Sequence, residues 1–79
     1  MTRHDILAQN IEARKANVIG YQINIDNYCA AIADIEANHP DLAPFAEELR
    51  GRLKSEEYER KKEQVMLAAL KFNLEEKGV

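Results

Sequence analysis

Cysteine, serine and histidine side chains, which can act as nucleophiles, proton carriers or metal ligands, are few in this sequence and lie far apart. The 79 residues include one cysteine, Cys29, one serine, Ser55, and two histidines, His4 and His39. A serine–histidine–acid triad would have to recruit Ser55 together with a histidine from the N-terminus or from a turn. One thiol and two imidazoles are fewer ligands than a zinc site needs, and one cysteine cannot form an internal disulfide. We therefore expect no enzyme, with no catalytic residue, no metal and no cofactor.

The remaining candidates for chemistry have simpler interpretations. The sequence contains no GxxxxGK[ST], GxGxxG or HExxH motif, so it predicts neither a phosphate cradle nor a zinc-protease site. Adjacent carboxylates such as Glu47–Glu48 diverge by about 100° on a helix, which is typical of a solvated face and not of an acid/base pair. We expect Cys29 to be a small buried or half-buried hydrophobic residue and His39 to be a turn residue.

Composition narrows the class of protein. Hydrophobic residues make up 46% of the chain and charged residues 32%, which favours a folded domain over a disordered tail. The sequence has no apolar run long enough for a transmembrane helix, and its N-terminus carries charges where a signal peptide needs apolar residues. The net charge of −3 argues against a general nucleic-acid or anionic-membrane binder. We expect a cytoplasmic protein.

The first segment, from about residue 4 to residue 38, has a seven-residue apolar repeat typical of a long amphipathic, coiled-coil-like helix. At ~1.5 Å per residue it would be roughly 52 Å long, too long for a small globular domain to surround. Arg14 is a charged exception in the repeat. Gly20 is either a tolerated weak point or a site of close backbone contact. The aliphatic residues expected to face a second helix are Leu7, Ile11, Val18, Ile25, Ile32 and Ile35.

A turn is predicted at about residues 39–43, because Pro40 disfavours the helical conformation of the residue before it. A second helix is expected from about residue 44 to residue 76, capped by Asp41 and with Pro44 in its first turn. Its leucines stay on one side at ~100° per residue, which favours a single continuous helix. The alternative is a break near residues 51–55, which would give three helices. The leucines expected at the contact are Leu49, Leu53, Leu67, Leu70 and Leu74.

Two helices of similar length joined by a tight turn predict an all-α fold, a long antiparallel helical hairpin forming one domain over residues 1–79. Folding back in this way places Ile35 near Ala46 and Ile11 near Leu70. The middle of the contact is polar. Its side chains either pair internally as a partly wet layer, or form a notch that fixes the register or receives a partner. These polar residues are Arg14, Glu56, Arg60 and Glu63.

Each helix also carries a second apolar stripe, well away from the contact. The stripes comprise Ala16, Ile19, Ile23, Ala30 and Ala37 on the first helix, and Tyr58, Val65, Ala69 and Phe72 on the second. Left exposed, they would form one elongated patch larger than soluble monomers usually tolerate.

Because a solitary hairpin buries only one stripe per helix, the second stripes imply further neighbours. We expect a homo-oligomer, most simply a two-fold dimer forming a four-helix assembly with Tyr21 and Tyr58 near its polar middle. A complex with another protein is a second solution. A monomeric three-helix bundle, in which the last segment covers Ile19 and Ile23, is the alternative to association. The expected oligomer interface comprises Ile19, Ile23, Tyr58, Val65 and Phe72.

Two basic clusters lie on the second helix. They alternate with glutamates, which is typical of a solvated face with charge pairs four residues apart. The alternative is a surface that contacts DNA in a dimer, although no helix-turn-helix pattern is present. The clusters are Arg50, Arg52 and Lys54, and Arg60, Lys61 and Lys62.

In overall style, the run from NIEARKANVIG (residues 10–20) to LKFNLEEKG (residues 70–78) resembles the small early-region proteins of lambdoid bacteriophages and their prophages, in particular those encoded between the exonuclease and excisionase genes. The resemblance implies a short, cytoplasmic, non-enzymatic protein that perturbs the host or the lysis–lysogeny choice by binding other proteins. We therefore expect a regulatory protein–protein interaction module. The alternatives are a structural or assembly protein, and a nucleic-acid-associated regulator that uses the basic clusters.

Overall fold

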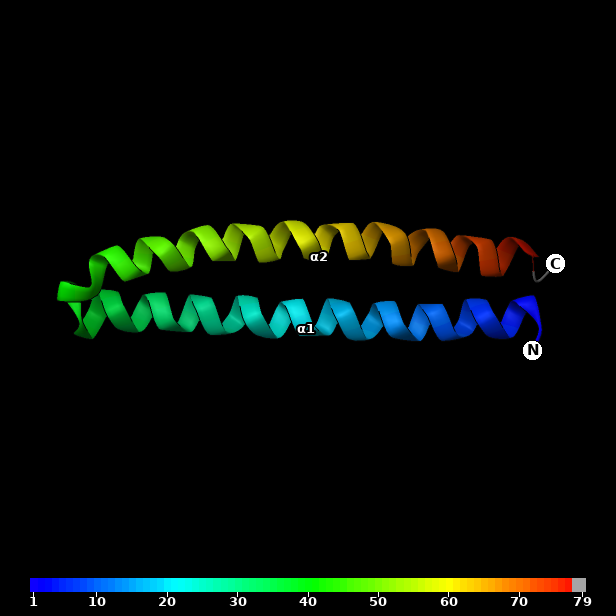
Figure 1. The fold of residues 1–79 in the computed structure, drawn as a ribbon, viewed down its shortest axis with the longest axis horizontal. Helices are drawn as coiled ribbons and strands as arrows, with labels where there is room; N and C mark the ends of the chain where they lie inside the picture. The colour runs from blue at the N-terminus through cyan, green and yellow to red at the C-terminus, as the bar shows by residue number, and fades with distance from the viewer. Residues whose placement is uncertain (78–79) are drawn as a thin grey trace.

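The computed structural model describes residues 1–77 and is an all-α hairpin, as the sequence predicts. Helix α1 spans Arg3–Asn38, a short 3-10 turn η1 spans Pro40–Leu42, and helix α2 spans Ala43–Lys77. The two long helices run antiparallel and lie side by side over their whole length (Figure 1). The Cα atoms fill a rod of 58 × 15 × 15 Å, so nearly every residue lies close to solvent.

Helix α1 begins at a capping box. The Thr2 side-chain oxygen accepts a hydrogen bond from the Asp5 amide at 3.1 Å, and the Thr2 amide donates to the Asp5 carboxylate at 3.3 Å. These two bonds satisfy amide groups that the first turn of a helix leaves without partners. The carboxylate of Asp5 also lies at the positive end of the helix dipole.

The turn at the other end of α1 depends on a proline. His39, the residue before Pro40, leaves the helical conformation with φ −138° and ψ 61°, and its amide still donates to Ile35. The Leu42 amide then donates to the His39 carbonyl at 2.9 Å, which closes η1. The expectation that Asp41 caps α2 is wrong. Because Pro40 starts a 3-10 turn that leads directly into α2, Asp41 lies inside that turn and not at the helix boundary.

Helix α2 continues without a break through Gly51 and Ser55. The alternative of a break near residues 51–55 is therefore wrong, and so is the three-helix bundle that would follow from it. The physical reason is the phase of the apolar repeat. Leu49 and Leu53 before the charged stretch and Leu67 after it face the same neighbour only while the helix stays continuous.

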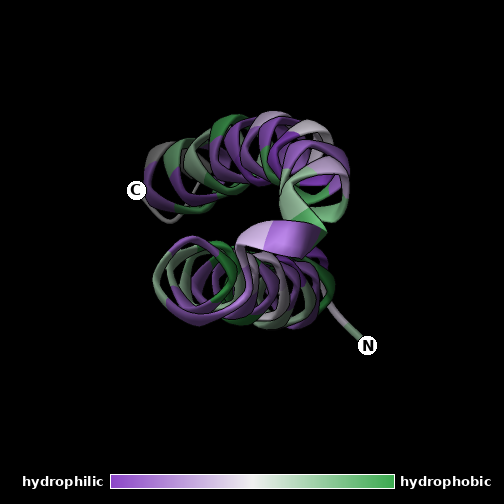
Figure 2. Ribbon diagram, turned by 90° about the vertical axis from the view of Figure 1, so that its left-hand side faces the viewer, coloured by the Kyte–Doolittle hydropathy of each residue, from purple (hydrophilic) through white to green (hydrophobic). Residues whose placement is uncertain are grey.

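The seam is the contact surface between α1 and α2. Its tightest part lies beside η1, where Ile35, Ala46 and Leu49 are 2–5% exposed and Tyr28 and Ile32 pack against them. Further along, Ile11 and Ile25 are also buried. The other residues expected in the seam are half-buried: Leu7, Val18, Ile32, Leu53, Leu67, Leu70 and Leu74. Viewed along the rod, hydrophobic residues also lie on surfaces of both helices that face away from the seam (Figure 2).

Truncation of the tightest part of the seam should be costly. We expect Leu49→Ala to lower the free energy of unfolding by about 2–4 kcal/mol, because the lost side chain leaves a cavity between two rigid helices. Urea unfolding measures this difference. Ile6→Ala, at a position 48% exposed, is the control and should change stability by less than about 1 kcal/mol. Equal effects of the two variants would contradict the helix pairing.

Two glycines in the helices have no steric role within one hairpin. A Cβ atom built at Gly20 or at Gly51 meets no atom within 4 Å. Since glycine costs about 1 kcal/mol relative to alanine inside a helix, we expect Gly20→Ala and Gly51→Ala each to raise the stability of the single hairpin by about that amount. Thermal unfolding at the lowest practical protein concentration is the measurement. A destabilised Gly20→Ala variant would contradict the open surroundings of Gly20.

Candidate interaction surfaces

The structure does not bring the chemistry-bearing residues together. His4 and Ser55 are exposed on different parts of the rod, and His39 lies 3.6 Å from the Asp34 carboxylate at the turn. Within residues 1–77, no group of three or more histidine, cysteine or acidic side chains is arranged to hold a metal ion. The expectation of a buried or half-buried Cys29 is wrong, because this residue is exposed. It follows Tyr28 of the seam by one residue, and the rotation of about 100° carries it to the rim.

The polar middle of the seam is a set of internal pairs. Arg14 donates from one guanidinium nitrogen to both carboxylate oxygens of Glu63 at 3.1 Å. Asn17 donates to the same carboxylate at 3.5 Å. The side chain of Glu63 is 17% exposed and that of Arg14 is 34% exposed, so the pair is partly withdrawn from water. The carboxylate of Glu63 therefore has two partners on α1 and is not presented to another molecule.

Two further bonds extend this polar layer toward the turn. Arg60 donates to the side-chain oxygen of Gln22, and Asn24 donates to Glu56 at 3.4 Å. The Nε atom of Arg60 is buried and has no partner among the described residues. The layer thus joins α2 to amide side chains of α1 that the sequence analysis did not single out. The interpretation as a partly wet internal layer fits these contacts better than a notch that receives a partner.

Three of the six basic side chains in the clusters of α2 pair with carboxylates of the chain. Arg50 pairs with Glu36 and Glu47, and Arg52 pairs with Glu48 at 2.9 Å. Positive charges engaged in this way do not form the continuous basic surface that phosphate contacts require.

Lys62 lies beside the ring of Tyr58. Its Nζ atom lies 3.0 Å from the Glu59 carboxylate and 5.1 Å from the centre of the ring. The hydrogen bond to Glu59 raises the pKa of the exposed Lys62 amine above its ordinary value, so the amine is charged at neutral pH.

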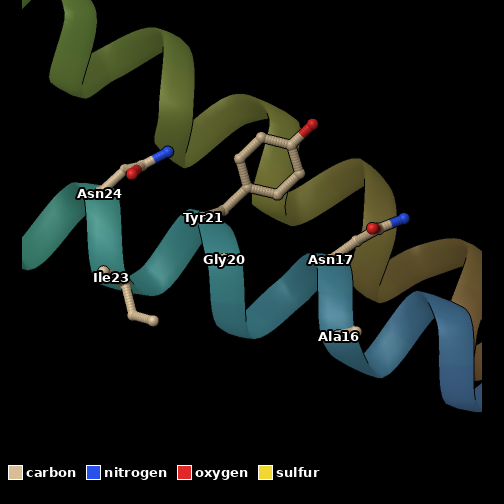
Figure 3. Close-up of a pocket in the computed structure, with 6 residues that line it drawn as sticks. All are labelled: Ala16, Asn17, Gly20, Tyr21, Ile23 and Asn24. Carbon is tan, nitrogen blue, oxygen red and sulfur yellow. The ribbon is translucent and has the colours of Figure 1, made fainter.

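The outer face of α1 is its second apolar stripe, comprising Ala16, Ile19, Ile23, Ala30 and Ala37. All five residues are exposed, Ile19 at 60% and Ile23 at 54%. Figure 3 shows Ile23 pointing away from α2, whereas Asn17, Tyr21 and Asn24 point toward it. The last three residues, together with Ala16, Gly20 and Ile23, line a shallow groove along this part of α1.

The outer face of α2 comprises Tyr58, Val65, Ala69 and Phe72. Its three large side chains are 61–66% exposed. Val65 lies two residues from both Glu63 and Leu67, which are half-buried in the seam, so a rotation of about 200° places it on the far side of α2.

The two stripes therefore lie on opposite sides of the hairpin. The expectation of one elongated patch is wrong, because each stripe is opposite the seam on its own helix. Within one hairpin, Tyr21 is half-buried on the seam side of α1, and Tyr58 is 63% exposed on the outer side of α2.

The sequence matches no family model, and no curated protein or solved structure shows significant similarity to it. Within residues 1–77, neither helix has a stretch long and apolar enough to cross a membrane.

A double-mutant cycle should measure how much the ion pair between Arg14 and Glu63 contributes to the free energy of unfolding. We expect Glu63→Leu to lower the free energy of unfolding by about 1–2 kcal/mol, because it leaves a half-buried guanidinium without its carboxylate. The double variant Arg14→Leu/Glu63→Leu should recover most of this loss, since two leucines continue the apolar seam.

Urea unfolding of the four proteins in the cycle gives the coupling energy. Glu12→Gln is the control, because it changes the exposed pair between Glu12 and Lys15 and should alter stability by less than about 0.5 kcal/mol. A Glu63→Leu variant as stable as the parent would contradict a structural role for this carboxylate.

Proposed function

We propose that this chain is a non-enzymatic protein–protein interaction module that associates through the outer faces of its two helices. The observation that carries the proposal is the exposure of Ile19, Ile23, Tyr58, Val65 and Phe72, each more than half accessible to solvent. Isolated surface hydrophobics are ordinary, but stripes that repeat along a helix are typical of a contact surface.

The shortage of core supports the same proposal. Five side chains in residues 1–75, for which the structure describes burial, are buried, and none of them is completely enclosed. A two-helix rod with so little interior is marginal alone, and small scaffolds of this kind commonly gain stability from association. Binding that covers an outer face would therefore stabilise the fold by mass action.

A regulatory role is the part of the proposal that rests on resemblance. The early-region proteins of lambdoid phages, which this sequence resembles, act as small cytoplasmic proteins that bind other proteins of the host or the phage. A hairpin with two apolar outer faces offers surfaces for such binding. Because three of the six basic side chains in the clusters already pair with carboxylates of the chain, the structure gives less support to a nucleic-acid-associated regulator.

The test of association is sedimentation equilibrium at tens of micromolar. We expect the parent protein to exceed the monomer mass of 9.0 kDa. The double variant Ile23→Lys/Val65→Glu, which places a charge on each outer face, should sediment as a monomer and melt at a lower temperature.

The matched control is Met66→Glu. Met66 is 46% exposed and lies one residue from Val65, about 100° away from the centre of the outer face. This variant should keep the parent's mass. A parent protein that remains at 9.0 kDa at every concentration would contradict association between copies, and a Met66→Glu variant that dissociates as fully as the double variant would contradict the assignment of the contact to the outer faces.

A further inference from the structure

The two outer faces differ in charge. On α1, Asp26 and Asp34 lie within one turn of Ile23, Ala30 and Ala37. The carboxylate of Asp26 accepts a hydrogen bond from the side-chain amide of Gln22 at 2.9 Å. The carboxylate of Asp34 accepts one from the side-chain amide of Asn38 at 2.8 Å and lies 3.6 Å from the ring of His39. Glu12 also lies on this side, although Lys15 pairs with it at 3.2 Å. Apart from Lys15, the charges that border the outer face of α1 are acidic.

The outer face of α2 has the opposite sign at its centre. Lys54, Lys61 and Lys62 each lie within one turn of Tyr58, and the last two also lie within one turn of Val65. All three lysines are exposed. Of the three, Lys62 is engaged by a carboxylate of its own helix, Glu59. Glu57 and Glu59 flank Tyr58 in the sequence, so the three lysines around this aromatic and this aliphatic side chain exceed the carboxylates by one.

These charges discriminate between the ways in which two copies can meet. A two-fold contact places each face against itself, and would bring Asp26 near another Asp26 or the lysines of α2 near one another. A contact between unlike faces brings carboxylates toward lysines, and charge complementarity of this kind selects the orientation of association. We infer that copies of this chain associate by docking the outer face of α1 of one hairpin onto the outer face of α2 of another. This inference rests on the proposed function.

The positions of the outer-face residues along the long axis of the rod fit such a contact. Inside the hairpin, Ile35 packs on Ala46 and Gln22 bonds to Arg60, so Ile23 lies level with Tyr58. A second hairpin placed beside the first without rotation keeps this antiparallel register. Ile23 then meets Tyr58 of the next copy, and Asp26 lies within a turn of Lys54. Asp34 lies level with Glu47 of the next copy, a carboxylate that already pairs with Arg50.

Smaller residues meet at other levels of the same contact. The same placement sets Ala16 opposite Val65 and Ala30 opposite Gly51. Small residues at facing positions allow two helices to approach closely. The groove beside Gly20 lies next to this contact on α1, where the structure leaves open space.

Docking between unlike faces has a distinctive consequence for assembly. Each copy keeps one face unused after the first contact, so association continues beyond two copies unless rotation closes a ring. The parent protein should therefore show masses above twice 9.0 kDa as its concentration rises. A two-fold dimer would stop at two copies.

The decisive experiment uses two single-face variants in a mixing assay. Ile23→Lys impairs the outer face of α1, and Val65→Glu impairs the outer face of α2. Each variant alone lacks one of the two unlike faces, so each should sediment at 9.0 kDa. A one-to-one mixture brings together the intact α2 face of one variant and the intact α1 face of the other. It should form complexes that stop at two chains, because the remaining outer face of each chain is impaired.

Each other result has a definite meaning. A parent that associates while either single variant still forms dimers alone would show a two-fold contact, which overturns this inference and leaves the proposed association in place. Single variants that remain monomeric in the mixture would also overturn it. A parent that never exceeds 9.0 kDa would overturn the proposed association itself.

Salt provides an independent measurement on the parent protein. Raising the ionic strength from about 0.1 M to about 1 M shortens the Debye length from about 10 Å to about 3 Å. A contact between unlike charges should weaken over this range, so the mean mass should fall. A contact between like charges should strengthen, so a rising mean mass would contradict docking between unlike faces. Circular dichroism of every variant at both salt concentrations controls for loss of helix.

Discussion

Contact between α1 and α2 is the interaction on which the whole molecule depends, because each long helix has the other as its single long neighbour in the chain. Residues that recur at seven-residue intervals on α1 meet the corresponding repeat of α2, and the deepest of them, Ala46, is 2% exposed. Everything else is arranged around this seam. The capping box of Thr2 and the proline of η1 set where the helices begin and end, and the residues opposite the seam remain in water.

The quality of this contact varies along the rod. Beside η1 the seam is apolar and tight, in the middle it contains Arg14 and Glu63, and toward the N-terminus its residues are mostly half-buried. Local stability in proteins follows the density of buried contacts. The hairpin should therefore be most persistent near the turn, and the polar layer specifies which residues face one another more than it adds to the total stability.

The seam was predictable from the sequence because a seven-residue repeat fixes which side of a helix is covered, and residues from Leu7 to Leu74 follow that repeat. The geometry opposite the seam was harder to predict, since the position of Ile23 relative to Tyr58 depends on how the helices are placed. Asn17, Gln22 and Asn24 gave no periodic signal, because amide side chains in the polar layer resemble those of a solvated face. The capping box did have a sequence signal, a threonine three residues before an aspartate. The exposure of Cys29 was harder to predict, because a rotation by one residue decides whether a side chain at the edge of the seam is covered.

The start of α1 and the end of α2 lie side by side, at the end of the rod opposite η1 (Figure 1). A pulling force applied between Arg3 and Lys77 would therefore separate the helices as a zipper opens, loading one layer of side chains at a time. The half-buried leucines would yield first, then the pair of Arg14 with Glu63, and last the cluster around Leu49. The same seam pulled along its length, with force applied at the turn and at one end, would load many layers together. The mechanical strength of this rod therefore depends on the direction of the load.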